Sequence, residues 1–187
     1  MSGNVKYTRL RDEQRIRIPG TDYSVAPAVA AQLGPDVLAT SNTVEILLRY
    51  VEDAEDWDVW SIGVIRDEGE PPISSDALRE IAPTAAIRAA LHGVPDLVVH
   101  GPDVPVDEYW DGLRPGLAAR RADGPTSENL SVLSDVYRVA GVLRRPQVMT
   151  AARMFDIPGR TATHWVKLAR ERGYLRGRDG AAADSAQ

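Results

Sequence analysis

The stretch that decides the fold lies near the C-terminus and reads Gln147–Phe155 (QVMTAARMF), Asp156–Gly159 (DIPG) and Arg160–Arg172 (RTATHWVKLARER). The apolar residues of the first and last parts recur at i, i+3, i+4 and i+7, which is one face of a helix: Val148, Ala151, Ala152 and Phe155, then Ala162, Trp165, Val166 and Ala169. The segment between them is so short that only a sharp turn fits, and its proline suits the first turn of a helix. The stretch therefore predicts two short helices joined by a tight turn.

A third helix is expected just before this pair. An apolar stripe runs from about Ser127 to Val142, and Thr126 or Ser127 can cap its start: Leu130, Leu133, Val136, Tyr137 and Ala140. Short helices with narrow apolar stripes are not stable alone, so the three must pack on one another. Together they predict a trihelical helix-turn-helix unit, a fold that places one helix in the major groove of DNA.

The outward face of the last helix carries the candidate binding residues. The positions left after the apolar stripe is removed are Arg160, Thr161, Thr163, His164 and Lys167. Arginine pairs with guanine edges, threonine contacts thymine methyls or phosphates, and lysine neutralises phosphates. Of these we expect Arg160, Thr163, His164 and Lys167 at base edges, with Arg144, Arg145 and Arg170 on the DNA backbone. The alternative is an ordinary solvated helix face.

The charges of the chain are segregated. From Tyr137 to Arg178 there are ten lysines and arginines against two acids, a net charge of +8; because the whole chain carries −5, the remainder carries −13. A basic lobe can dock on phosphates although the protein as a whole is acidic. We expect the acidic remainder to face away from DNA.

The segment Phe155–Leu175 resembles the helix-turn-helix of small DNA-binding proteins from actinobacteria and their phages. The features it shares with them are Trp165-Val166, Ala169-Arg170 and Gly173-Tyr174-Leu175. It departs from the pattern at Asp156, where a turn glycine is common, and at Pro158-Gly159, where Ser-Arg is common. The resemblance covers only the C-terminal helices, and it implies DNA binding and usually gene regulation.

The N-terminal part predicts a small antiparallel sheet covered by helix. Short strands are expected at Val5–Leu10 and Arg15–Ile18, and a hairpin at Thr43–Val51 and Trp57–Arg66. A helical stretch capped by Ser74 or Ser75 follows and is interrupted at Pro83. On a regular strand Trp57 and Trp60 lie on opposite faces, which predicts one core residue and one interface or ligand contact, with a dimer contact favoured.

The predicted fold class is therefore α+β: a small N-terminal antiparallel sheet with helices, then a C-terminal trihelical helix-turn-helix unit. The expected parts are an α+β domain at 1–92, a connector rich in proline and glycine at 93–125, the helix-turn-helix domain at 126–176 and a disordered tail at 177–187. The connector also holds Tyr109, Trp110 and Leu113, which predicts partial order.

Neither an enzyme nor a membrane protein is expected. The chain has no cysteine, which removes disulfides, thiol catalysis and cysteine-ligated zinc. The acids between Glu52 and Asp58 lack the spacing of a calcium loop, and His92, His100 and His164 are isolated. We predict no catalytic residue, metal or cofactor. Since no apolar run could span a bilayer and no signal peptide is visible, we predict a cytoplasmic protein.

The leading hypothesis is a sequence-specific double-stranded DNA-binding protein, a transcriptional regulator that acts as a homodimer or higher homo-oligomer. Its acidic N-terminal domain would dimerise, sense a signal or recruit a protein partner. The alternatives are a phage-type architectural or DNA-packaging adaptor, and a protein-interaction module that does not bind DNA.

Overall fold

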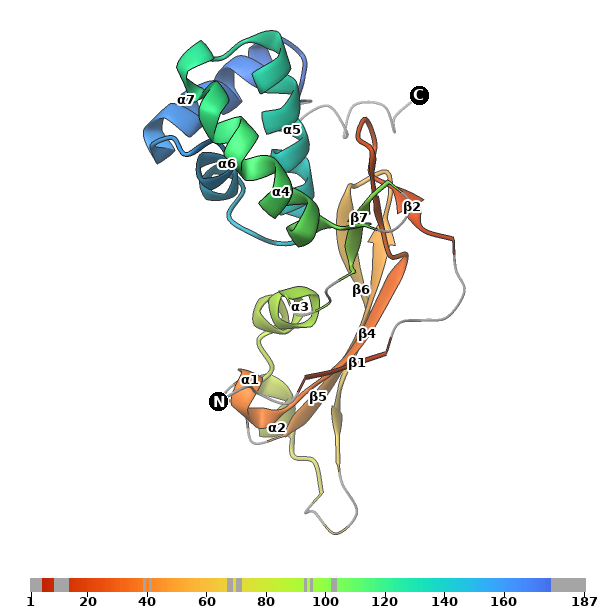
Figure 1. The fold of residues 1–187 in the computed structure, drawn as a ribbon. Helices are drawn as coiled ribbons and strands as arrows, with labels where there is room; N and C mark the ends of the chain where they lie inside the picture. The colour runs from red at the N-terminus through yellow and green to blue at the C-terminus, as the bar shows by residue number, and fades with distance from the viewer. Residues whose placement is uncertain are drawn as a thin grey trace, which may run out of the picture.

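The chain folds as an α+β protein, as predicted, in a computed structural model that describes residues 5–8, 14–38, 40, 42–66, 69, 72–92, 94, 96–101 and 104–175. Two four-stranded antiparallel sheets form the N-terminal part. The helices of residues 106–171 gather into a lobe at one end of the strands (Figure 1). The predicted tail at 177–187 and the end of the first predicted strand, Leu10, lie outside the described residues.

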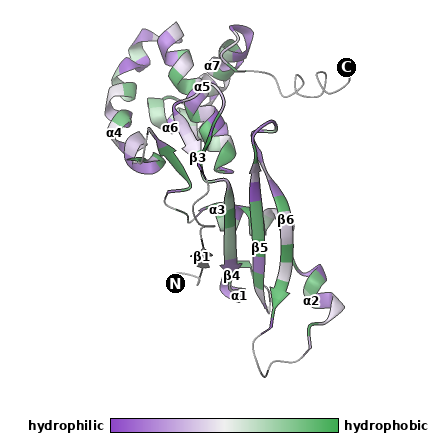
Figure 2. Cartoon of the chain, turned by 90° about the vertical axis from the view of Figure 1, so that its right-hand side faces the viewer, coloured by the Kyte–Doolittle hydropathy of each residue, from purple (hydrophilic) through white to green (hydrophobic). Residues whose placement is uncertain are grey.

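The first sheet has the order β1–β4–β5–β6, and its strands are β1 Val5–Thr8, β4 Ala28–Leu33, β5 Thr43–Val51 and β6 Asp56–Ile65. Strands β5 and β6 form the predicted hairpin. Along β5 the buried side chains alternate with more exposed ones, visible as bands of contrasting colour in Figure 2. The buried set, which defines the inner face, is Val44, Ile46, Leu48 and Tyr50.

Short helices cover the inner face of this sheet. They are α1 Pro35–Leu38, α2 Ser75–Arg79 and α3 Pro83–His92, and all three lie on the same side of the strands in Figure 1. Helix α3 contacts β4 and β5, and its Ala86 and Ala90 are fully buried. The predicted break at Pro83 is confirmed, and so is the cap, because the Ser74 hydroxyl accepts a hydrogen bond from the Ala77 amide over 3.1 Å.

A β-bulge in β6 separates the two tryptophans of that strand. Leu47 pairs with Ser61 and Leu48 pairs with Val59, so Trp60 is an extra residue between them. Trp57 is buried at 5% exposure and Trp60 is 64% exposed. The Arg49 guanidinium lies 5.3 Å from the centre of the Trp60 ring, which places Trp60 on the face opposite the inner one, the outer face.

Two strands of the second sheet and a long helix occupy the segment that the sequence predicted as a connector. The sheet has the order β2–β3–β7–β8, with β2 Ile16–Arg17, β3 Tyr23–Val25, β7 Val98–His100 and β8 Val104–Pro105. Helix α4 Val106–Ala119 and the 3-10 turn η1 Arg120–Asp123 follow. The prediction of a partly ordered connector at 93–125 is therefore wrong for much of its length. A regular apolar spacing outweighs its glycines and prolines: Val106, Trp110, Leu113 and Leu117.

The C-terminal lobe contains the three predicted helices with α4 packed against the second of them. They are α5 Ser127–Val142, α6 Gln147–Phe155 and α7 Gly159–Glu171. The predicted cap of α5 is present, since the Thr126 hydroxyl accepts a hydrogen bond from the Asn129 amide over 3.2 Å. The Phe155 and Trp165 rings meet edge to face, with centroids 5.5 Å apart, in the middle of the helical core.

Direct hydrogen bonds attach the lobe to both sheets. From β6, the Trp57 indole donates to the carbonyl oxygen of Val142 in α5 over 2.8 Å. From α5, Arg138 donates to the carbonyl oxygens of Pro19 and Tyr174, each over 3.0 Å. The turn at Gly20 has a φ of +68°, and a side chain there would collide with the Arg138 guanidinium. The lobe is thus attached to both sheets by hydrogen bonds.

Candidate nucleic-acid interface

A left-handed residue makes the turn between α6 and α7. Asp156 follows Phe155 with φ 51° and ψ 47°, the conformation that favours glycine and that aspartate tolerates better than most residues. The Ile157 amide donates to the Ala152 carbonyl oxygen over 3.0 Å and closes the end of α6. Pro158 then stands at the N-cap of α7. Aspartate therefore fills the backbone role that a glycine has in the family pattern.

Arg121 of η1 holds this turn from outside. Its guanidinium pairs with the Asp156 carboxylate and lies 3.3 Å from the Asp156 carbonyl oxygen. Both side chains are more than half exposed, so the pair is screened by water. The contact nevertheless ties η1, which lies in the predicted connector, to the geometry of the turn.

The apolar stripe of α7 is buried as predicted. It consists of Ala162, Trp165, Val166 and Ala169, and none of these is more than 3% exposed. Helix α7 contacts both α5 and α6 through this side. The opposite side of the helix is therefore fixed in its outward orientation.

Four predicted binding residues share that outward side. Arg160, Thr163, His164 and Lys167 recur at i, i+3, i+4 and i+7, and all four are exposed. We call them the α7 stripe. Within the part of the chain that the structure describes, Arg160 and His164 form no ion pair or hydrogen bond.

The other two stripe residues have weak local contacts, and Thr161 lies beside the stripe. The Thr163 hydroxyl donates to the Gly159 carbonyl oxygen over 2.9 Å, and the Lys167 ammonium lies 3.7 Å from a Glu171 carboxylate oxygen. Both contacts are exposed and easily exchanged for others. Thr161 is only partly exposed.

The structure gives Arg144 and Arg145 partners within the chain. At the corner between α5 and α6, Arg144 pairs with Asp56 over 2.7 Å, and Arg145 binds both carboxylate oxygens of Asp107, over 2.5 and 2.8 Å. The hydrogen bonds from Arg145 hold the pKa of Asp107 below its usual value of 3.8. Both predicted DNA-backbone contacts are thus neutralised by carboxylates of β6 and α4.

Arg170 also bonds within the lobe. Its guanidinium donates to the Tyr137 hydroxyl over 3.0 Å and lies 5.7 Å from the centre of that ring. The side chain remains exposed, and its charge has no carboxylate partner in the described residues. Arg170 therefore lies between α5 and α7 with its charge available.

Sequence reasoning missed cations outside α7. Arg153, seven residues before Arg160, is exposed on α6 and forms no ion pair with any described residue. Arg120 and Arg121 belong to η1 and pair with Glu128 and Asp156. Arg153 could have been found from its position, since the residues beside the α6 apolar stripe point outward. The η1 arginines could not, because their segment was predicted as a connector.

The acidic and histidine side chains that could suggest an enzyme make contacts within the fold. Asp56 pairs with Arg144, and the His100 ring stacks on Tyr109 with centroids 3.6 Å apart. Across the described ranges, no three acidic or histidine side chains group closely enough to hold a metal ion. Those ranges also contain no helix long and apolar enough to cross a membrane.

No protein family, no curated protein and no solved structure gives a significant match to this chain.

Proposed function

We propose that this protein binds double-stranded DNA and inserts α7 into the major groove. The observation that carries the proposal is the α7 stripe: exposed cationic and hydrogen-bonding side chains on one helix, whose opposite side is locked into a trihelical core. An α-helix fits the major groove, and its outward residues meet the base edges there.

The side chains of the stripe suit different contacts. Arg160 is free to pair with a guanine edge, and Thr163 and His164 can donate to bases or phosphates. Lys167 and Arg170 supply charge for phosphates. Arg153 on α6 extends the cationic surface beyond α7 and is a further candidate for the DNA backbone. Arg144 and Arg145, already paired with carboxylates, contribute less to phosphate binding than the sequence predicts.

Three further parts of the proposal come from the sequence. The resemblance of Phe155–Leu175 to actinobacterial and phage helix-turn-helix proteins favours a transcriptional regulator. A single short helix reads few base pairs, which favours a homodimer or higher homo-oligomer. The proposal places the protein in the cytoplasm with its DNA, and the acidic N-terminal part is free to contact a protein partner.

The test is selection of bound sequences from a pool of random DNA duplexes. The affinity of the protein for the selected duplexes is then measured at several salt concentrations. An enriched inverted repeat supports a dimeric, sequence-specific regulator. Steeply salt-dependent binding without an enriched motif supports the architectural or DNA-packaging adaptor instead. Absence of binding at low salt overturns the proposal and favours a protein-interaction module.

A further inference from the structure

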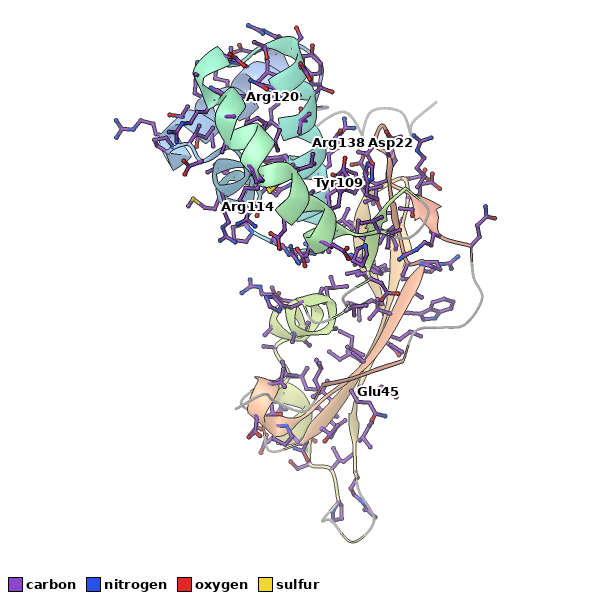
Figure 3. All side chains as sticks on the ribbon, viewed as in Figure 1. Asp22, Glu45, Tyr109, Arg114, Arg120 and Arg138 are labelled. Atoms are coloured by element: carbon purple, nitrogen blue, oxygen red, sulfur yellow. The ribbon has the colours of Figure 1, made fainter. Side chains whose placement is uncertain are left out.

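The outer face of the first sheet has no helix packed on it within the described ranges, whereas the inner face is covered (Figure 1). Glu45 projects from this uncovered side in Figure 3. Exposed or half-exposed residues of β5 and β6 form the face: Glu45, Leu47, Arg49, Val51, Asp58, Trp60, Ser61 and Gly63. An open antiparallel sheet commonly has one solvated face, so exposure alone indicates no partner.

Two features distinguish this face from an ordinary solvated one. The first is Trp60, which at 64% is the most exposed large apolar side chain among the described residues. A bulge turns it outward, and the Arg49 guanidinium lies over its ring. Exposed tryptophans beside arginine are typical of the centres of protein interfaces. The second feature is the spacing of charges along β5.

The charges on β5 are arranged symmetrically about Leu47. Glu45 and Arg49 lie two residues before and two residues after it, on the same face, and carry opposite charges. The cross-strand neighbours of Leu47 are the small residues Ala30 and Ser61, so a second chain can approach Leu47 closely. These are the properties that a self-complementary surface requires.

A two-fold axis makes the match concrete. If the axis crosses β5 at Leu47 and lies in the plane between two facing sheets, the partner strand runs in the opposite direction. Arg49 then faces Glu45 of the second copy, and Glu45 faces its Arg49. Facing sheets pack about 10 Å apart, a gap that an arginine and a glutamate side chain can bridge together.

We propose that the outer face of the first sheet is a homodimer surface, with Leu47 and Trp60 at its centre and two symmetry-related Arg49–Glu45 ion pairs beside them. The occupant is a second copy of this chain, because an unrelated partner would not require opposite charges at equal distances from one residue. The proposed dimer surface consists only of residues of the first sheet. It does not depend on DNA binding by α7.

The size of the face indicates a weak dimer. The strands of this sheet contain four to ten residues, each residue is about 3.4 Å long and neighbouring strands are about 4.8 Å apart, so the face covers on the order of 500 Å². That is below the usual share of roughly 800 Å² per partner in stable complexes. We therefore expect dissociation in the micromolar range, and self-association must be measured up to about 100 μM protein.

The experiment is sedimentation velocity of the full chain without DNA, on wild type and surface variants. Arg49→Glu and Glu45→Arg should each raise the dimer Kd by about tenfold or more, because like charges then meet across the axis. The double variant Glu45→Arg/Arg49→Glu should return the Kd to near the wild-type value. Trp60→Ala should raise it by about tenfold or more.

Matched controls lie elsewhere on the surface. Arg88→Glu reverses an exposed charge on α3, and Leu78→Ala removes a 53% exposed apolar side chain on α2; neither should change the Kd. A wild-type chain that stays monomeric throughout the range overturns the proposal. So does a dimer insensitive to Trp60→Ala, or single reversals that the double variant fails to rescue. Duplex binding is measured separately, so failure here leaves the DNA proposal standing.

Discussion

The indole nitrogen of Trp57 donates a hydrogen bond to the carbonyl oxygen of Val142, 2.8 Å away and 85 residues later in the chain. Val142 is the last residue of α5, where helix carbonyls lack partners within the helix. Both residues are buried, so water cannot substitute for the indole. The β5–β6 hairpin therefore caps the central helix of the lobe and fixes one part of the molecule on the other.

Trp57→Phe tests this cap. The ring fills most of the same space, but the Val142 carbonyl oxygen is left buried without its donor. We expect the free energy of unfolding to fall by about 1–3 kcal/mol, measured by urea denaturation. Trp60→Phe is the matched control and should leave it unchanged at protein concentrations where the chain is monomeric, because Trp60 is mostly exposed. Equal losses in both variants would show that the hydrogen bond is not the cause.

Arg160→Ala tests the proposed contact with bases. Loss of a bidentate pair with guanine should weaken binding to the selected duplex by roughly 1–3 kcal/mol and relax selectivity at one base position. Fluorescence anisotropy on the selected duplex and its single-base variants measures both effects. Arg88→Ala on α3 removes a similar exposed cation outside the lobe and should leave selectivity intact. If the two variants behave alike, α7 does not read bases.

The pair between Arg145 and Asp107 is expected to act on stability. A double-mutant cycle with Arg145→Ala and Asp107→Asn should give a coupling of about 0.5–1 kcal/mol in urea unfolding, discounted for partial exposure. The lowered pKa of Asp107 means that this contribution is present above pH 3.8 and is lost as the pH falls through the still lower folded pKa. A coupling unchanged well below that pH would contradict the assignment.

Substitutions at Asp156 separate its backbone role from its charge. The residue is left-handed, and glycine adopts this conformation without the cost that a β-carbon imposes. We expect Asp156→Gly to be more stable than Asp156→Ala by about 1–2 kcal/mol, although both lose the pair with Arg121. Thermal unfolding measures the difference. Equal stability of the two variants would mean that the turn changes its conformation when the side chain is removed.

Asp135 makes the stability of the fold depend on pH between 3.8 and about 6. Burial, together with Asp22, raises its pKa to about 6 against the opposing effect of Arg138; Figure 3 labels Asp22 and Arg138 where the lobe meets the strands. Because the folded pKa exceeds the usual 3.8, the folded state binds the extra proton, and stability falls as the pH rises between these values. Asp135→Asn should remove that fall. In urea unfolding from pH 3.5 to pH 8, the free energy of unfolding of the variant should rise relative to that of wild type only above pH 3.8, the usual pKa.

Much of the lobe could be predicted from sequence because residues close to the helix ends determine where its helices begin and end. Thr126 caps α5, the left-handed Asp156 ends α6, and α7 has an uninterrupted apolar stripe. The sequence does not predict α4, because the glycines and prolines of its segment are typical of a connector although its apolar spacing is helical. Pro115 and two exposed glycines do not break a helix whose buried face is held by Trp110 and Leu117.

Some residues of the candidate site could be predicted from sequence and others could not. A helical period tells which side of α7 is buried, so it also tells that Arg160, Thr163, His164 and Lys167 point outward. No such period exists at the corner residues Arg144 and Arg145. Their partners, Asp56 and Asp107, are distant in sequence, and only the tertiary fold shows that these charges are already matched.

The packing of α4 on α6 limits which segment of this chain a gene rearrangement can transfer to another protein. A gene rearrangement that transfers only residues 126–176 to another protein would leave behind Trp110 and Leu117, which lie buried between α4 and its neighbours. It would also lose Arg121 and its hold on the turn before α7. A transferred segment that keeps these contacts therefore has to start before α4, near Val104.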